Sequence, residues 1–238
     1  MDKLYVIIPA YNESANIQNL IDDWYPIVDN HNNEGDSRLI IVNDGSSDNT
    51  LETVLECAKT RPLLKVLTKP NSGHGATVLF GYRYAIKHNA DYIFQTDSDR
   101  QTIPDEFEQF WSLRKQYDAI IGNRSARQDG KARKFVEKTL LAILKIIFNV
   151  RIPDSNAPFR LMKRELIEQY IKKMPENYNL PNVMLTTYFV YFHEKVKFIE
   201  ITFKPRQGGV NSINTIKILK MGWNALGDFI HLKKHIDD

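Results

Sequence analysis

The sequence contains a single cysteine, Cys57, among its 238 residues. One cysteine permits no disulfide within the chain, and no set of cysteines and histidines has the spacing of a zinc site. We therefore expect a protein of a reducing compartment, the cytoplasm. The net charge of only +3 is too small to indicate a nucleic-acid-binding protein, and we expect no nucleic acid among its partners.

The sequence also lacks a long hydrophobic run. The longest apolar stretch, TLLAILKIIFNV at 139–150, reaches about half of the ~20 residues that a membrane-spanning helix needs, and it contains Lys145. The apolar run in the N-terminal MDKLYVIIPAYNE turns polar after a few residues, which is typical of a strand and not of a signal peptide. We expect any membrane contact to be peripheral, at the inner face of the cell membrane.

The composition is that of a soluble globular protein, with 42% hydrophobic and 26% charged residues. The first half of the chain alternates short apolar runs with helical patterns, and polar turns follow the apolar runs. This alternation predicts an α/β fold with a mostly parallel, Rossmann-like sheet flanked by helices. The predicted strands are 5–9, 39–42, 64–67, 92–96 and 119–121, and the predicted helices are 13–28, 51–59 and 76–87.

The second half is less regular. It predicts helices at 134–148, 164–172 and 182–193 and a strand at 197–203. In the tail at 215–232, apolar residues recur three or four positions apart and predict a C-terminal amphipathic helix. We find no internal repeat and no linker. We therefore expect a catalytic domain, residues 1–212, followed by a helical extension, residues 213–238.

Two aspartates one residue apart, Asp97 and Asp99, follow a predicted central strand in the stretch FQTDSDRQT. Asp-rich turns are often only solvated turns. At the carboxyl end of a buried strand, however, these carboxylates would point to the edge where open α/β sheets bind ligands. Hard oxygen ligands with room for water suit Mg²⁺ or Mn²⁺, and Gln101 adds a carbonyl oxygen. The sequence therefore predicts a divalent metal site that bridges phosphates.

The turn PAYNE follows the first predicted strand, which Pro9 ends. Tyr11 is placed to stack on a nucleotide base, and Glu13 is placed to accept hydrogen bonds from the base edge or the ribose. A hydrophobic contact for Tyr11 and a favourable carboxylate at a helix start for Glu13 explain the same residues equally well.

Two more turns follow the next strands. In NDGSSD, helix capping explains the serine and the last aspartate, whereas it does not require Asp44, which we interpret as a base or ribose contact. In NSGHG, Gly73 and Gly75 would let backbone N–H groups approach a ligand at a helix N-terminus. Neither the GxGxxG nor the GxxxxGK[ST] fingerprint is present, so this pair of glycines is weak evidence alone.

Taken together, these motifs resemble a known family. IIPAYNE, IVNDGSSD, the NSGHG loop and TDSD look like the nucleotide-sugar half of family 2 glycosyltransferases with the GT-A fold, in order and spacing over residues 4–124. IIGNR, DSNAPFRLMKR and FKPRQGGVNSI resemble the dolichol-phosphate mannosyltransferase branch, which includes the bacterial polyprenyl-phosphate glucosyltransferases. The resemblance implies inverting transfer of a sugar from a UDP- or GDP-sugar to a polyprenyl or dolichyl phosphate.

The resemblance also implies roles for individual residues. Asp97, Asp99 and Gln101 would hold Mg²⁺ or Mn²⁺ on the nucleotide diphosphate. Asp99 and Arg206 would act in catalysis. Arg206 would lie on a flexible loop over the donor and would also help to bind the donor. Arg124 would face the acceptor phosphate.

A basic, apolar helix that Arg133 opens would complete the acceptor site, and its lysines suit contact with the membrane surface. A core helix with a solvated lysine face explains the same stretch equally well. Two departures from the branch stand out. Pro158 replaces a usual glycine in a loop near the sugar, and Glu137 stands close to where a serine is expected to help hold the lipid phosphate.

A second acceptor remains open. A family 2 enzyme could instead add the sugar to a saccharide hydroxyl in cell-surface polysaccharide biosynthesis. Such members usually carry an ED pair and a Q-x-x-RW segment, and this sequence has neither, which favours a phosphate acceptor. A hydroxyl acceptor also needs a general base. Asp154 is the only candidate base, and a helix cap or an ion pair with Arg160 explains it at least as well.

Overall fold

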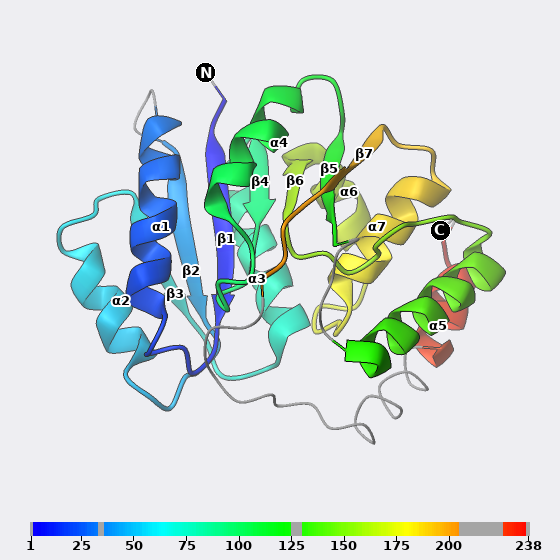
Figure 1. Ribbon diagram of the computed structural model, residues 1–238, viewed down its shortest axis with the longest axis horizontal. Helices are drawn as coiled ribbons and strands as arrows, with labels where there is room; N and C mark the ends of the chain where they lie inside the picture. Colours follow the sequence, from blue (N-terminus) through cyan, green and yellow to red (C-terminus); the bar gives the residue numbers. More distant parts are fainter. Residues whose placement is uncertain (1, 33–35, 125–129, 205–225, 237–238) are drawn as a thin grey trace.

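The computed structural model describes residues 2–32, 36–124, 130–204 and 226–236, without the side chains of 130–135. Among these residues, seven strands form one sheet in the order β3-β2-β1-β4-β6-β5-β7 (Figure 1). Neighbouring strands are parallel except at β6, which runs antiparallel to β4 and β5. The mostly parallel sheet predicted from the sequence is confirmed. The strands are β1 (Leu4–Ala10), β2 (Arg38–Asn43), β3 (Leu64–Thr68), β4 (Tyr92–Gln95), β5 (Ala119–Asn123), β6 (Arg160–Lys163) and β7 (Val196–Glu200).

Helices cover both faces of the sheet, so the central strands are buried on both sides, and β1 contains only apolar residues. One face packs against α1 (Ile17–Asn30), α2 (Thr50–Ala58) and α4 (Phe107–Leu113), which follows the short 3-10 helix η1 (Pro104–Glu106). The other face packs against α3 (His74–Lys87), α5 (Gly130–Phe148), α6 (Arg164–Ile171) and α7 (Pro181–Tyr191). In β1, Leu4, Val6 and Ile8 belong to the first core, whereas Tyr5 and Ile7 belong to the second.

Strand β6 is the main difference from the sequence prediction, which treated its surroundings as a loop. It inserts between β4 and β5 and pairs Arg160 with both Gln95 and Ile121. Its four residues, RLMK, are too few to show a period of two, and its pairing depends on contacts distant in sequence. The sequence prediction also omitted η1 and α4.

Helix α1 begins four residues later than predicted. Residues before Ile17 form a turn in which the Glu13 carbonyl oxygen accepts hydrogen bonds from the N–H groups of Asn16 and Ile17, both at 2.9 Å. The other predicted elements agree with the structure to within a few residues.

The described part of the C-terminal tail, residues 226–236, contains a helix at 226–234. Phe229, Leu232 and Ile236 are buried in the second core, and the Phe229 ring lies 6.4 Å from that of Phe148 on α5. This tail is therefore anchored to the domain. The proposed division after residue 212 lies outside the described residues and stays a prediction. None of the helices described is long and apolar enough to cross a membrane.

Candidate functional site

The turns selected from the sequence lie at one edge of the sheet. Strand β1 pairs in parallel with β2 on one side and with β4 on the other, so the carboxyl ends of all three strands meet there. Tyr11 and Asp44 follow β1 and β2, and Asp97 follows β4. The fold thus brings residues distant in sequence to the edge at which open α/β sheets bind ligands.

The acidic pair is partly exposed. Asp97 has a side chain that is 31% exposed, and its Oδ1 accepts hydrogen bonds from the Gln95 side-chain amide at 3.3 Å and from His74 Nε2 at 3.1 Å. Asp99 Oδ1 accepts a hydrogen bond from the backbone N–H of Gln101 at 3.2 Å. The pair is therefore ordered by protein hydrogen bonds, and its role toward a metal stays a prediction.

Gln101 fixes the loop that carries the pair. Its side-chain nitrogen donates to the Lys204 carbonyl oxygen at 2.7 Å, and its own carbonyl oxygen accepts the Lys204 N–H, also at 2.7 Å. A second tie joins the hydroxyls of Thr96 and Thr102 at 3.0 Å. The hydrogen bond from the Gln101 side chain to Lys204 fixes the orientation of the amide, whose oxygen is the atom that suits a cation.

These donors fit Mg²⁺ or Mn²⁺ by their chemistry. Two carboxylates and an amide oxygen are hard ligands, and both ions retain water or phosphate oxygens to complete their coordination. In the part of the chain that the structure describes, no cluster of three or more histidine, cysteine or acidic residues is arranged to hold a metal alone.

His74 is a site residue that the sequence analysis did not select. It is the first residue of α3 and reaches across the sheet edge to Asp97. Histidines are scattered in this sequence, and only the fold shows that this one meets the acidic pair. The NSGHG motif was the available signal.

After β1, Tyr11 is 50% exposed to solvent, as a residue that stacks on a base must be. Its neighbour Asn12 adopts φ of 54° and ties two turns together, because its Oδ1 accepts the N–H of Ser47 at 2.9 Å. Pro9 is buried within β1. Glu13 is also buried and accepts a hydrogen bond from the side chain of Asn16 at 3.3 Å, so it organises the start of α1. The ligand roles of these residues stay predictions.

Asp44 closes the loop between β3 and α3. Its carboxylate accepts hydrogen bonds from the backbone N–H groups of Ser72 and Gly73, both at 3.0 Å, and from the Lys69 ammonium. Its side chain is almost completely buried. The proposed contact with a base or ribose stays a prediction, but the structure gives Asp44 a loop-closing role that the sequence did not indicate.

The two glycines of NSGHG serve different purposes. Gly73 has φ of 90°, a conformation that favours glycine. Gly75 has an ordinary backbone, but a Cβ there would lie 2.4 Å from the carbonyl oxygen of Asn179. Close packing against the segment before α7 therefore requires Gly75, whereas its predicted contact with a ligand is untested.

Arg124 and Asp154 form a buried, two-pronged ion pair. Arg124 Nε donates to Asp154 Oδ2 at 2.7 Å and its Nη2 donates to Oδ1 at 2.9 Å, while the ring of Phe203 lies 5.1 Å from the guanidinium. Burial alone would raise the pKa of the Asp154 carboxyl, but the hydrogen bonds and charge of Arg124 lower it below its usual value. The pKa of Arg124 is raised, because Asp154, and after it Glu137 and Asp97, outweigh its burial.

This pair changes two expectations. Asp154 pairs with Arg124 and not with Arg160, and a carboxylate with both oxygens bonded to arginine and a lowered pKa is a poor general base. Arg124 remains close to the site, yet two of its three nitrogens are directed at Asp154. A role for Arg124 toward a phosphate thus requires the N–H groups of Nη1 and Nη2 that do not point at Asp154, or a rearrangement of the pair.

Arg160 is completely buried. It donates to the carbonyl oxygens of Ala157 and Asn182 and to the hydroxyl of Thr186 at 2.8–3.3 Å. Burial lowers its pKa, although Tyr82 and the nearby carboxylates act in the opposite direction. Arg160 therefore ties the buried loop that contains Pro158 to the first turn of α7.

Two predicted site residues cannot be placed. Arg206 lies outside the described residues. Arg133 belongs to α5, but its side chain is outside the described part of the structure. Both roles stay predictions.

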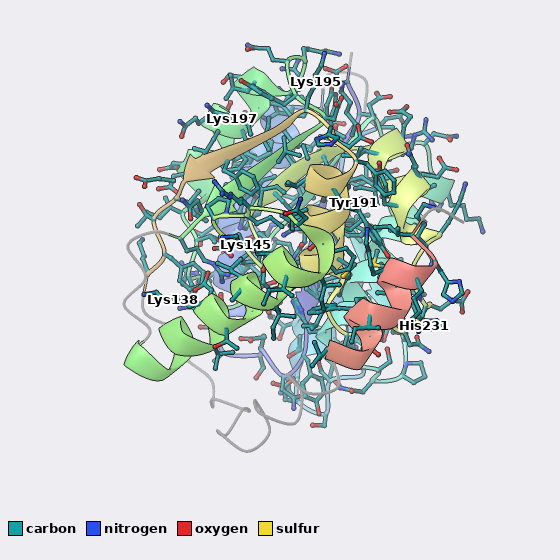
Figure 2. All side chains as sticks on the ribbon, turned by 90° about the vertical axis from the view of Figure 1, so that its right-hand side faces the viewer. Lys138, Lys145, Tyr191, Lys195, Lys197 and His231 are labelled. Atoms are coloured by element: carbon teal, nitrogen blue, oxygen red, sulfur yellow. The ribbon has the colours of Figure 1, made fainter. Side chains whose placement is uncertain are left out.

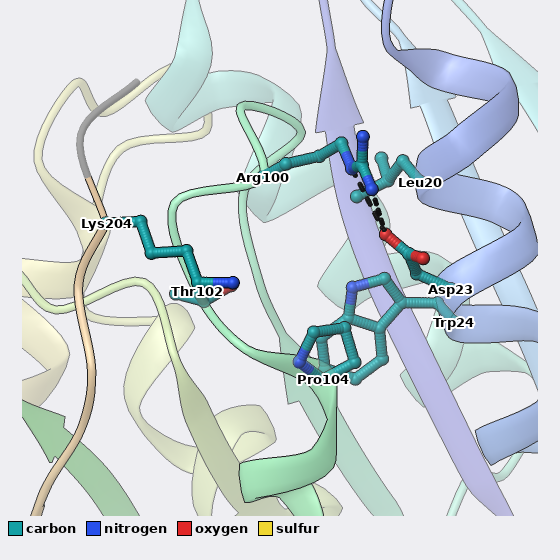
Figure 3. Close-up of a pocket in the computed structure, with 7 residues that line it drawn as sticks. All are labelled: Leu20, Asp23, Trp24, Arg100, Thr102, Pro104 and Lys204. Atoms are coloured by element: carbon teal, nitrogen blue, oxygen red, sulfur yellow. Dashed lines mark hydrogen bonds and ion pairs between the residues drawn. The ribbon is translucent and has the colours of Figure 1, made fainter. Parts of the chain in front are cut away.

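A small polar pocket adjoins the acidic loop on its α1 side (Figure 3). Across it, Arg100 donates to Asp23 Oδ2 from Nε at 3.1 Å and from Nη2 at 2.8 Å, which fastens the loop to α1. The lining residues are Leu20, Asp23, Trp24, Arg100, Thr102, Pro104 and Lys204. None of the predicted site residues lines this pocket.

Comparisons with known proteins identify the family of the chain. The family model "Glycosyl transferase family 2" matches residues 5–171. An undecaprenyl-phosphate 4-deoxy-4-formamido-L-arabinose transferase of Photorhabdus laumondii is 24% identical over 94% of this chain and 67% of its own length. A dolichyl-phosphate beta-glucosyltransferase of Trichomonas vaginalis is 31% identical over 67% of this chain and 51% of its own length. The chain thus spans about two thirds of the first relative and about half of the second.

Among solved structures, glucosyl-3-phosphoglycerate synthase from Mycobacterium tuberculosis, in complex with Mn²⁺, UDP-glucose and glycerol 3-phosphate, superposes with a TM-score of 0.70. The match covers 98% of this chain and 80% of that chain at 15% identity, which is a likeness of fold. The family model covers well over half of the sequence. The chain therefore belongs to glycosyl transferase family 2 and adopts the GT-A fold.

Proposed function

We propose that this glycosyltransferase moves a sugar from a UDP- or GDP-sugar to the phosphate of a polyprenyl-type lipid, with inversion at the sugar carbon. The observation that carries the proposal is the joint placement of Tyr11, Asp97 and Asp99 at the carboxyl ends of β1 and β4. The names of the relatives supply the acceptor class, because they specify undecaprenyl phosphate and dolichyl phosphate.

The donor end of the site follows from its chemistry. Tyr11 offers an exposed ring for the base, and oxygens of Asp97, Asp99 and Gln101 would hold Mg²⁺ or Mn²⁺ on the diphosphate. The ion, when bound, neutralises the charge that grows on the leaving diphosphate. A solved structure of the same fold contains Mn²⁺ and UDP-glucose, which supports this assignment.

A phosphate acceptor is favoured over a hydroxyl. Phosphate is already anionic at neutral pH, so no protein base has to take a proton from it. The only base nominated from the sequence, Asp154, is bonded to Arg124 through both oxygens and has a lowered pKa. A hydroxyl acceptor in surface-polysaccharide assembly would need a base that the described site does not offer at this position.

One face of the molecule suits a lipid surface. Lys138 and Lys145 project from α5, and Lys195 and Lys197 lie at β7 on the same face (Figure 2). Ile146, beside Lys145, is 82% exposed. Lysines on one face, together with an exposed apolar side chain on the same helix, are suited to an anionic membrane surface, where lysine stems lie along apolar groups. Contact at the inner face of the membrane remains part of this proposal.

Lys204 is the last described residue before the segment that contains Arg206, and its backbone is tied to Gln101 beside the acidic pair. This pairing holds Lys204 beside the loop that carries the acidic pair. We retain the proposal that Arg206 acts on the donor phosphates, because a guanidinium binds phosphate oxygens bidentately.

The test is transfer of radiolabelled sugar from a panel of UDP- and GDP-sugars with Mn²⁺. The acceptors are undecaprenyl phosphate, the matched alcohol undecaprenol, and oligosaccharides. We expect label in the organic phase with the phosphate and not with the alcohol. Equal transfer to the alcohol, or transfer only to oligosaccharides, would replace the phosphate acceptor with a hydroxyl acceptor.

A further inference from the structure

A buried side chain beneath the acidic pair has no role in the function proposed above. Gln95, the last residue of β4, is completely buried, and it precedes Asp97 by two positions. A buried amide is costly unless hydrogen bonds satisfy it. Gln95 is bonded at both ends, to a phenol on one side and to Asp97 on the other.

The chemistry of these partners fixes the orientation of the Gln95 amide. The Tyr82 hydroxyl donates to Gln95 Oε1 at 3.0 Å. Burial raises the pKa of Tyr82, so the phenol keeps its proton and remains a donor. The amide nitrogen therefore faces Asp97 Oδ1, at 3.3 Å. The reversed amide would place its oxygen against a carboxylate oxygen, where neither atom is able to donate.

The surroundings rigidly hold the relay of hydrogen bonds that joins Tyr82, Gln95 and Asp97. Tyr82 is completely buried on α3, within the core that α3 forms with the sheet. Gln95 is paired in the sheet with Ile7 of β1 and with Arg160 of β6. Neither side chain has room to turn, because protein interiors are close-packed.

The relay selects one oxygen of Asp97. In the described part of the chain, both side-chain hydrogen bonds to Asp97 end on Oδ1, from Gln95 and from His74. Oδ2 is then the oxygen presented to a cation at the sheet edge. Hydrogen-bonded second partners of this kind orient metal-binding carboxylates, and their loss typically lowers metal affinity about 10–100-fold.

We propose that Gln95, held by Tyr82, is a positioning residue that orients the Asp97 carboxylate for a divalent metal and its diphosphate. This inference rests on the proposed function, because it assigns Asp97 to the metal. Gln95 does not touch the substrate. It acts through Asp97, and its effect should therefore be confined to binding that depends on the metal.

The experiment measures the affinity of the full chain for UDP and for GDP by titration calorimetry, with and without Mn²⁺. The variants are Gln95→Met, which keeps the length of the side chain and removes both hydrogen bonds, and Tyr82→Phe, which removes only the hydroxyl. The matched control is Tyr188→Phe. Tyr188 is also completely buried, but its hydroxyl donates to the Lys173 carbonyl oxygen at 3.5 Å, away from the acidic pair.

We expect Gln95→Met to weaken Mn²⁺-dependent binding about 10–100-fold and to leave metal-free binding unchanged. Tyr82→Phe should act in the same direction by less, and Tyr188→Phe should bind as the wild type does. Mn²⁺-dependent affinity of Gln95→Met within about twofold of wild type would overturn the inference and leave the proposed function standing. If Gln95→Met does not fold, Tyr82→Phe decides, and affinity equal to that of Tyr188→Phe overturns the inference. Wild-type binding that is indifferent to Mn²⁺ would overturn both.

Discussion

The buried ion pair between Arg124 and Asp154 allows a quantitative test of the structure. Their side chains are only 6% and 2% exposed, and two hydrogen bonds of 2.7 and 2.9 Å join them. Asp154→Ala would leave the Arg124 charge buried without its partner. Removing one member of a buried pair typically costs about 3–5 kcal/mol in the free energy of unfolding. At ~2–4 °C per kcal/mol for a domain of this size, the midpoint of thermal unfolding should fall by about 6–20 °C.

A second aspartate provides the matched control. Asp23 also accepts two hydrogen bonds from one arginine, Arg100, but this pair is 38% and 26% exposed. Asp23→Ala should therefore cost at most about 1 kcal/mol. Replacing both buried partners, as Arg124→Met with Asp154→Leu, should restore most of the lost stability, because no unpaired charge remains.

The assay is urea and thermal unfolding of the wild type and the variants, followed by circular dichroism. Loss of stability in Asp154→Ala no greater than in Asp23→Ala would refute the reasoning, since it would mean that the pair is solvated. The same variants separate stability from catalysis. The variant with both buried residues replaced should fold but should lose transfer to the lipid phosphate, because it lacks the arginine proposed to face that phosphate.

Three further predictions follow from the structure. Because the pKa of Asp154 is lower in the folded than in the unfolded chain, the stability it contributes should be full above about pH 5 and should decline as the pH falls through its folded pKa, as unfolding titrations of wild type and Asp154→Asn would show. Gly75→Ala should cost about 1–3 kcal/mol in unfolding, because its Cβ would meet the Asn179 carbonyl oxygen, whereas Gly227→Ala, with nothing within 4 Å, should not destabilise the protein. Tyr11→Ala should lose about 1–3 kcal/mol of UDP or GDP binding, measured by calorimetry, and Tyr11→Phe should bind as the wild type does. If Tyr11→Ala binds as tightly as the wild type, Tyr11 does not stack on the base.

The sequence predicted the first half of the fold well, because its strands and helices alternate with clear turns. Strands β1 to β4 and helices α2 and α3 are all close to their predicted positions. Strand β6 was missed because it has four residues and owes its place to pairing with β4 and β5, which are distant in sequence. In the second half, helices α5, α6 and α7 and strand β7 also lie within a few residues of their predicted positions.

The site was predictable in its position more than in its contacts. The motifs correctly indicated which turns meet at the sheet edge. They did not reveal that His74 bonds to Asp97, or that Asp44 closes the loop before α3. The ion pair of Asp154 with Arg160 that the sequence suggested was also wrong. The structure pairs Asp154 with Arg124, and the sequence alone does not distinguish the two arginines. Such contacts depend on packing between elements, which local pattern does not encode.

The most direct test of the central claim is to locate a metal at the sheet edge. Crystals grown with Mn²⁺ and UDP or GDP should show an anomalous scattering peak between the carboxylates of Asp97 and Asp99, in contact with the diphosphate. The base should lie against the ring of Tyr11. An Asp99→Asn crystal should lose the peak while keeping the same fold. A diphosphate bound elsewhere, or bound at this edge with no metal peak beside the two aspartates, would contradict the account.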